Sequence, residues 1–242
     1  MKGRSNWRFV KPYQKIPIQE CQEPIVAIPL EQFTVVSPHP YQSLGAPYGE
    51  YSPYFLRKGV SQKLLQAQAA LDTYQPGWHL QIFDAYRPIA VQQFMVDYSF
   101  AQLARSRGLD PTGLSDEMRS HLQTKVLEFW AVPSSSPSTP PPHSTGGAID
   151  LTLTDAASRS VDMGSPIDEI SPRSYPNYFA NRSETTWQKA HYHRNLLAEV
   201  MTEVGFRQHP NEWWHFSIGD QLWAWQVGGG AIARYGDASR LN

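Results

Sequence analysis

The 242-residue chain is predicted to adopt an α+β fold, in which helices flank a central, mainly antiparallel sheet. Two patterns predict this class: the expected helices come in blocks, and two expected strands follow each other near the C-terminus. The length is a third argument, because a single hydrophobic core is stable in a chain of this size. We therefore expect one domain over residues 1–242, with residues 1–58 as a largely irregular region packed on it.

The elements of the first half follow from their hydrophobic periods. Prolines concentrate in residues 11–53, where only one short strand is expected, at 24–30. A helix should begin at Val60, because apolar residues recur there with a period of 3.6. Residues 78–84 alternate between apolar and polar side chains and predict a strand. Pro88 suits the first position of the next helix, and a further helix is expected at 116–130.

The second half predicts strands around one long helix. Residues 147–153 alternate strictly, which indicates a strand with one apolar face. A helix is expected at 186–206, with Gly205 near its C-terminal cap. Residues 213–219 and 221–227 read as two further strands.

A Ser- and Pro-rich segment, residues 131–146, separates the two halves. Such a composition is typical of a linker between domains. The segment ends, however, beside His143, a candidate ligand whose partners all lie beyond it. We therefore expect a long active-site loop instead of a domain boundary.

Composition excludes several classes of function. Hydrophobic residues make up 40% and charged residues 18% of the chain, as in folded proteins, and the net charge is −1. Runs of Lys or Arg are absent, so neither nucleic acid nor a membrane surface is expected as a partner. The N-terminus shows no apolar signal region and no stretch approaches the ~20 apolar residues of a membrane span, so a cytoplasmic protein is expected. The single cysteine, Cys21, is expected to be a free, buried thiol.

Three polar residues interrupt otherwise apolar patterns and suggest a metal site on the sheet. Asp150 faces away from the apolar side of the strand at 147–153. His143 lies seven residues earlier, where the flexible Gly146–Gly147 pair can bend the chain back toward Asp150. His215 lies within the strand at 213–219. Two imidazoles and one carboxylate with an open fourth position are the ligands of catalytic zinc, so one Zn²⁺ per chain is expected.

Two further residues fit the chemistry of such a site. Glu212 follows a Pro-Asn turn, from which its carboxylate can reach a metal-bound water as the general base. Arg87 lies at the end of the strand at 78–84, where a guanidinium can stabilise the charge that develops on a substrate carbonyl.

Each candidate also has a purely structural interpretation. Single His and Asp residues are usually hydrogen-bonded or solvated, and Arg87 could simply pair with Asp84. Trp213 and Trp214 are expected in the core. The remaining candidates are expected to be solvated or without partners: His39, His121, His191, His193 and His209. Only the combination of residues favours catalysis.

The sequence resembles the VanX-type D-alanyl-D-alanine dipeptidases, zinc peptidases related to the lysostaphin-like and D-Ala-D-Ala carboxypeptidases. The resemblance rests on four motifs in the expected order: FDAYRP, PHSTGGAIDLTL, VDMGSPID and EWWHF. It implies hydrolysis of D-Ala-D-Ala, a cell-wall precursor, with zinc on His143, Asp150 and His215 and with Glu212 as the base.

The resemblance also implies roles in substrate binding. Arg87 would steady the scissile carbonyl, and Asp168 would bind the free amino group of the dipeptide. Pro141 stands where the family usually has a serine near that amino group, which bears on fine specificity. In the N-terminal region, Tyr48 or Tyr51 could line the pocket.

Three alternatives are open at this point. A carboxypeptidase or endopeptidase of the same superfamily would act on longer peptidoglycan peptides. A non-haem iron oxygenase also uses two histidines and a carboxylate, but it gives no role to Glu212 or Arg87. A zinc-bearing binding domain without catalysis would not need Glu212. The sequence indicates no oligomeric state.

Overall fold

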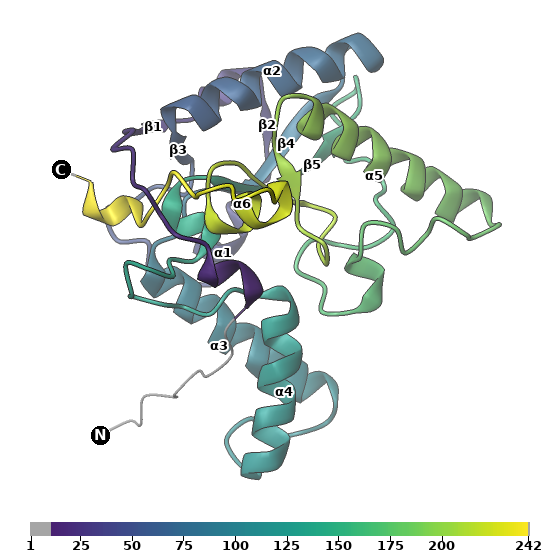
Figure 1. The fold of residues 1–242 in the computed structure, drawn as a ribbon. Helices are drawn as coiled ribbons and strands as arrows, with labels where there is room; N and C mark the ends of the chain where they lie inside the picture. Colours follow the sequence, from purple (N-terminus) through teal and green to yellow (C-terminus); the bar gives the residue numbers. More distant parts are fainter. Residues whose placement is uncertain (1–10, 242) are drawn as a thin grey trace.

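The computed structural model describes residues 11–241 and has the predicted α+β architecture. A five-stranded sheet lies at the centre, with helices around it (Figure 1). Its strand order is β2-β4-β5-β7-β6. Strand β2 runs parallel to β4, and every other neighbouring pair is antiparallel, so the sheet is mainly antiparallel as predicted. The strands are β2 (Thr34–Val35), β4 (His79–Asp84), β5 (Ala148–Thr154), β6 (Arg207–Gln208) and β7 (His215–Ser217).

The register of the central strands brings distant polar residues together. In the β5–β7 pair, Asp150 lies directly opposite His215. In the β4–β5 pair, Asp150 lies opposite Asp84, after an irregularity that follows Ile82. Residues paired across antiparallel strands point to the same face, so these three side chains share one side of the sheet.

Four long helices surround the sheet (Figure 1). Helices α2 (Lys58–Tyr74) and α5 (Thr185–Glu203) pack on it through one hydrophobic core, which includes Leu64, Leu71, Leu80, Ile82, Leu151, Leu197, Trp213 and Trp214. Helices α3 (Ile89–Ser106) and α4 (Asp116–Phe129) pair with each other and extend away from the sheet. A second cluster of buried residues joins α3 and α4 to the chain around Tyr41 and Tyr48. The predicted helices and the burial of both tryptophans are thus confirmed.

The region before α2 is more ordered than expected. It contains η1 (Pro12–Lys15), β1 (Ile25–Ala27), η2 (Leu30–Gln32), α1 (Pro40–Ser43) and β3 (Phe55–Arg57), besides β2 of the main sheet. Strands β1 and β3 form a separate antiparallel pair. Arg57, with no exposed surface, donates from Nε to the Thr145 carbonyl at 2.8 Å and from Nη1 to Glu20 at 2.9 Å. This side chain ties the N-terminal region to the segment that carries His143.

Three local predictions are wrong. Residues 221–227 form a helix, α6 (Gln221–Val227), because the Asp220 carboxylate caps it by accepting from the Trp223 amide at 2.7 Å. Pro88 precedes α3 as its cap residue and is not its first residue. Cys21 is exposed, because it lies in an extended segment that pairs with residue 234 through the backbone.

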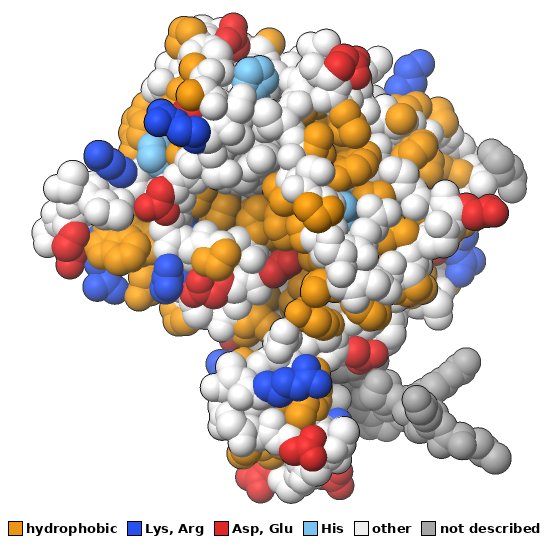
Figure 2. Space-filling view, turned by 180° about the vertical axis from the view of Figure 1, so that it is seen from behind, with side chains coloured by type: hydrophobic (Ala, Val, Ile, Leu, Met, Phe, Trp, Pro, Cys, Tyr) orange, Lys and Arg blue, Asp and Glu red, His pale blue; other side chains and the backbone are white. Residues whose placement is uncertain are grey.

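Charged side chains of both signs are distributed over the surface. On the face shown in Figure 2, basic and acidic side chains are interspersed and neither sign forms a continuous patch. Within residues 11–241, no helix is both long and apolar enough to cross a bilayer.

Candidate active site

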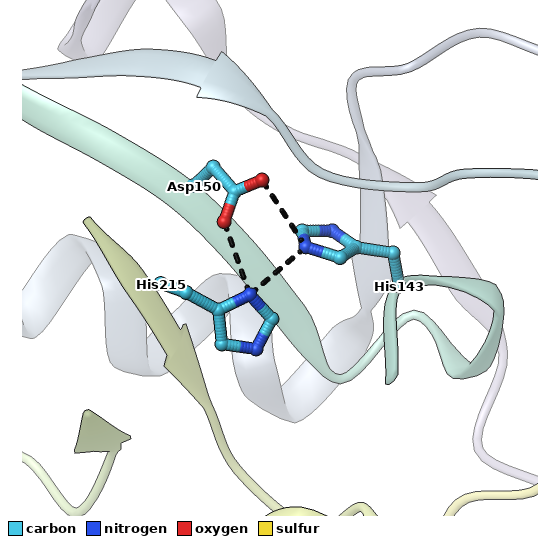
Figure 3. A group of neighbouring side chains, drawn as sticks. All are labelled: His143, Asp150 and His215. Carbon is cyan, nitrogen blue, oxygen red and sulfur yellow. Dashed lines mark hydrogen bonds and ion pairs between the residues drawn. The ribbon is translucent and has the colours of Figure 1, made fainter. Parts of the chain in front are cut away.

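His143, Asp150 and His215 meet in one buried triangle (Figure 3). His143 lies on the short helix η3 (Pro142–Thr145), and the other two lie on adjacent strands β5 and β7. His143 Nε2 is 3.1 Å from His215 Nδ1 and 3.2 Å from Asp150 Oδ2. His215 Nδ1 is 3.0 Å from Asp150 Oδ1. Gly146 makes the bend between η3 and β5 in the left-handed conformation, with φ of 71°, as expected for a glycine hinge.

The triangle has the dimensions of a metal-binding site. Ligands placed at about 2.0–2.1 Å from a tetrahedral metal ion lie about 3.3 Å from one another, close to the observed separations. His143 Nδ1 lies 2.7 Å from the carbonyl oxygen of Ala85 and must donate to it, which leaves the Nε2 lone pair directed at Asp150 and His215. The donor set, two nitrogens and one carboxylate, therefore fits a zinc-like ion.

Protonation in the triangle also suits a metal. Burial lowers the pKa of His143, and the Arg87 cation beside it adds to this effect. Burial would raise the pKa of Asp150, but His143 and His215 outweigh it and hold the pKa well below its ordinary value. A neutral imidazole and an ionised carboxylate are the forms that bind a metal ion.

Glu212 lies beside the triangle without belonging to it. It sits in the turn before β7, as expected from the Pro-Asn pair, and its Oε2 is 3.8 Å from His215 Nδ1. Its Oε1 is buried and receives no hydrogen bond from residues 11–241. Burial and the nearby Asp150 raise the pKa of Glu212 well above its ordinary value. The carboxylate is thus placed to hold or accept a proton next to the triangle.

Arg87 joins the triangle to a second buried carboxylate, Asp84. Its Nη2 is 3.0 Å from Asp150 Oδ2, and its Nε donates to Asp84 Oδ2 at 2.9 Å. Further bonds run from Nη1 to Gln92 at 3.0 Å and from Nη2 to the Tyr41 hydroxyl at 3.2 Å. Arg87 therefore forms the structural pair with Asp84 and also lies at the site.

The importance of Asp84 was not foreseen. It has no exposed surface and accepts from the Tyr48 hydroxyl at 2.7 Å, with His39 Nε2 at 3.2 Å. The predicted solvation of His39 is therefore wrong, because its partner lies 45 residues away in the sequence. Only the position of Asp84 at the end of a strand hinted at this network.

Asp168 lies in the same pocket, on the side of Tyr41. The Tyr41 hydroxyl donates to Asp168 Oδ2 at 2.8 Å. Burial, together with the negative charge of Asp150, raises the pKa of Asp168 to about 7. Its backbone has a φ of 66°, which is uncommon for a residue other than glycine and typical of functional sites.

One pocket contains all six predicted site residues: Arg87, His143, Asp150, Asp168, Glu212 and His215. Ala131 and Pro142, from the Ser- and Pro-rich segment 131–146, line it too, so this segment lies beside the site. Three other lining residues were not foreseen as such, namely Lys11, Tyr13 and His209.

Two expectations about this pocket are wrong. His209 is buried and lies 3.5 Å from Glu212, because the turn that carries Glu212 folds back over it. Tyr48 points to Asp84, and Tyr51 is 49% exposed, so neither of them lines the pocket. The tyrosines that do so, or that contact its residues, are Tyr13 and Tyr41.

Comparisons with known proteins agree with this site. A peptidase M15 family model described as D-Ala-D-Ala dipeptidase matches residues 34–229. The chain is 49% identical to the D-alanyl-D-alanine dipeptidase of Synechocystis sp. over 223 residues, 90% of each chain. It is 29% identical to the D-alanyl-D-alanine dipeptidase of Enterococcus faecium over 67% of this chain and 72% of that one.

A third relative is the D-alanyl-D-alanine dipeptidase of Escherichia coli, 40% identical over 31% of this chain and 37% of its own. Among solved structures, the LdcB LD-carboxypeptidase aligns with a TM-score of 0.42 and 14% identity, over 82% of this chain and 69% of that one. The family match covers most of the sequence and includes all six predicted site residues, from Arg87 to His215. The chain belongs to the D-Ala-D-Ala dipeptidase family of the M15 peptidases.

Proposed function

We propose that the protein hydrolyses the dipeptide D-Ala-D-Ala to two molecules of D-alanine, using one zinc ion held by His143, Asp150 and His215. The observation that carries the proposal is the buried triangle of two ring nitrogens and a carboxylate, with edges of 3.0–3.2 Å. The substrate is inferred from relatives of this family, one of them 49% identical and named a D-alanyl-D-alanine dipeptidase.

When bound, zinc would polarise the peptide carbonyl and acidify a water molecule for attack on it. Glu212 would act as the base, because its free, buried Oε1 can accept the proton that this water loses. As the peptide C–N bond breaks, Glu212 would pass that proton to the departing amine nitrogen. The water hydroxyl then ends on the new carboxyl group, and each product is one D-alanine.

Arg87 and Asp168 would position the substrate. The Arg87 guanidinium, held by Asp84 at 2.9 Å, would stabilise negative charge on the carbonyl oxygen as it develops. The Asp168 carboxylate, bonded only to the Tyr41 hydroxyl among side chains of residues 11–241, would bind the free ammonium of the dipeptide. Pro141 precedes η3 and supplies no hydroxyl for this ammonium, so Asp168 and Tyr41 would bind it without a serine.

The buried Asp168 favours a dipeptidase over a carboxypeptidase or endopeptidase. A longer peptide or an acyl cap would leave this carboxylate desolvated and without its partner, which typically costs several kcal/mol. An iron oxygenase or a non-catalytic zinc domain would require neither Asp168 nor the free carboxylate of Glu212.

Product analysis tests the proposal. Purified, zinc-loaded enzyme is incubated with D-Ala-D-Ala, N-acetyl-D-Ala-D-Ala or a muropeptide ending in D-Ala-D-Ala, and released D-alanine is measured. We expect rapid release from the free dipeptide and at least ~100-fold slower release from the other two. Equal rates on the free and acetylated dipeptides would replace the dipeptidase with a carboxypeptidase, and release from none of the three would refute the proposal.

A further inference from the structure

A buried lysine from outside the family-matched region reaches the active-site pocket. Lys11 lies well before residue 34, where the family match begins. It is only 8% exposed and lines the pocket together with Glu212 and His215. The segment around Lys11 therefore lies outside the residues that the family model matches.

The segment is held firmly in place over the pocket. Gln221 of α6 donates from Nε2 to the Ile16 carbonyl at 2.6 Å and to the Ser138 carbonyl at 3.0 Å. This one amide therefore joins the N-terminal segment to the loop beside the site. The backbone of Lys11 donates to Gln14 Oε1 at 2.9 Å, which starts the helix η1. The backbone of the segment that carries Lys11 is thus fixed by several contacts.

No carboxylate of the described chain bonds directly to the Lys11 ammonium, although the charge of Glu212 lies near it. Its Nζ makes no hydrogen bond or ion pair with residues 11–241, and residues 1–10 contain no acidic side chain. The other cation of the pocket, Arg87, is by contrast bonded to two carboxylates. A mostly buried ammonium that no carboxylate bonds directly can still accept an anionic partner, so an anionic ligand next to Lys11 would bind favourably.

The position of Lys11 near Glu212 also suits one particular anion, the terminal carboxylate of the substrate. Lys11 and Glu212 line the pocket together and their charges attract each other, whereas Asp168 is bonded to the Tyr41 hydroxyl, which also accepts from Arg87. Glu212 must lie next to the departing amine of the substrate if it delivers the proton there. In D-Ala-D-Ala, the terminal carboxylate is attached to the same Cα as that amine, about 2.5 Å from it.

We propose that Lys11 binds the C-terminal carboxylate of the substrate, while Asp168 of the same pocket binds its ammonium. This assignment rests on the proposed dipeptide hydrolysis. The pocket then holds both charged ends of a dipeptide, an anion for the ammonium and a cation for the carboxylate. Binding of the carboxylate by Lys11 also explains why the substrate would have to end with the residue that follows the scissile bond.

A comparison of the acid and its amide tests the assignment. The kinetics of D-Ala-D-Ala and D-Ala-D-alaninamide are measured with wild-type enzyme, Lys11→Met and Lys15→Met. Lys15 is the matched control, because it ends the helix η1 that Lys11 precedes and is exposed. For Lys11→Met we expect kcat/KM on the acid to fall about 10- to 100-fold, mainly through KM, with less than about a threefold change on the amide. Lys15→Met should behave as wild type.

A second measurement does not depend on turnover. The Kd of D-Ala-D-Ala for metal-stripped enzyme should rise by a similar factor in Lys11→Met and stay constant in Lys15→Met. Lys11→Gln, which keeps a polar group without the charge, replaces the methionine variant if circular dichroism shows that the latter does not fold.

The outcomes separate this inference from the proposed function. An equal loss on acid and amide, or a shifted pH profile with an unchanged acid-to-amide ratio, would mean that Lys11 acts through Glu212 and would overturn the assignment. If the wild-type enzyme cleaves neither ligand, the proposed function fails. The Kd comparison then decides by itself whether Lys11 binds a carboxylate.

Discussion

Replacing Asp84 by asparagine should destabilise the protein and displace Arg87. Asp84 Oδ2 accepts from Arg87 Nε at 2.9 Å, and its Oδ1 accepts from the Tyr48 hydroxyl at 2.7 Å. Burial acts to raise the pKa of Asp84, but Arg87 outweighs this effect, aided by His39, and the pKa lies below its ordinary value. The pair is therefore fully ionised at pH 7, and its contribution to stability is lost only as the pH falls through this low pKa.

The contacts of Asp84 determine how much the substitution lowers the free energy of unfolding. An asparagine would turn its amide nitrogen toward Tyr48, whose hydroxyl can rotate to accept, and would keep its oxygen facing Arg87. The hydrogen bonds to Arg87 and Tyr48 then survive, but the bond from His39 Nε2 is lost, because its Nδ1 accepts from the Gln42 amide and its Nε2 therefore needs an acceptor. The guanidinium also loses a buried countercharge. Breaking a buried ion pair typically costs about 3–5 kcal/mol, and we expect a value near the lower end of this range.

Urea unfolding at pH 7 with a chelator present measures this cost without any contribution from a metal. Asp155→Asn is the control, because Asp155 pairs with Arg159 at 2.7 Å across a surface where Arg159 is 78% exposed. That exposed pair should contribute at most about 1 kcal/mol. The Asp84 variant should also lose kcat, since Arg87 is no longer fixed. If both variants lower the free energy of unfolding equally, Asp84 is not the anchor of Arg87.

Two further outcomes are expected from substitutions in the pocket. Arg87→Ala should lower kcat and not only raise KM, because the contact of Arg87 with the carbonyl oxygen strengthens as negative charge develops there. Steady-state kinetics on D-Ala-D-Ala measure both constants, and an effect on KM alone would contradict this role of Arg87. Asp168→Ala should reduce the preference for D-Ala-D-Ala over its N-acetyl derivative, mainly by slowing hydrolysis of the free dipeptide. If the ratio of the kcat/KM values of the two substrates is unchanged, Asp168 does not bind the ammonium.

Regular patterns in the sequence were sufficient to predict the framework of the site. The alternation around Asp150 predicted which face of β5 it occupies, and the glycine pair before it predicted the turn that returns His143 to it. Both are local properties, because strand alternation and left-handed glycine conformations depend on a few neighbouring residues.

The unforeseen residues all depend on contacts between distant segments. His39 and Asp84 lie 45 residues apart, and Lys11 reaches the pocket in a segment that Gln221, more than 200 residues later, helps to hold. A single polar residue carries no periodic signal, so its burial cannot be read from its neighbours in sequence. The helix α6 was predicted as a strand for a different, local reason. Its apolar, tryptophan-rich residues are typical of a strand, but the capping carboxylate of Asp220 favours a helix.

The metal content of purified variants tests the central claim most directly. Elemental analysis should find about one zinc per chain in the wild-type enzyme, and little or none in His143→Ala, Asp150→Ala or His215→Ala. Glu212→Gln is the matched control, since it changes a neighbour that lies 3.8 Å from His215 and is not a ligand. It should keep its zinc while losing at least ~100-fold in turnover of D-Ala-D-Ala. Full zinc occupancy in all three alanine variants, or near wild-type turnover by Glu212→Gln, would contradict the account.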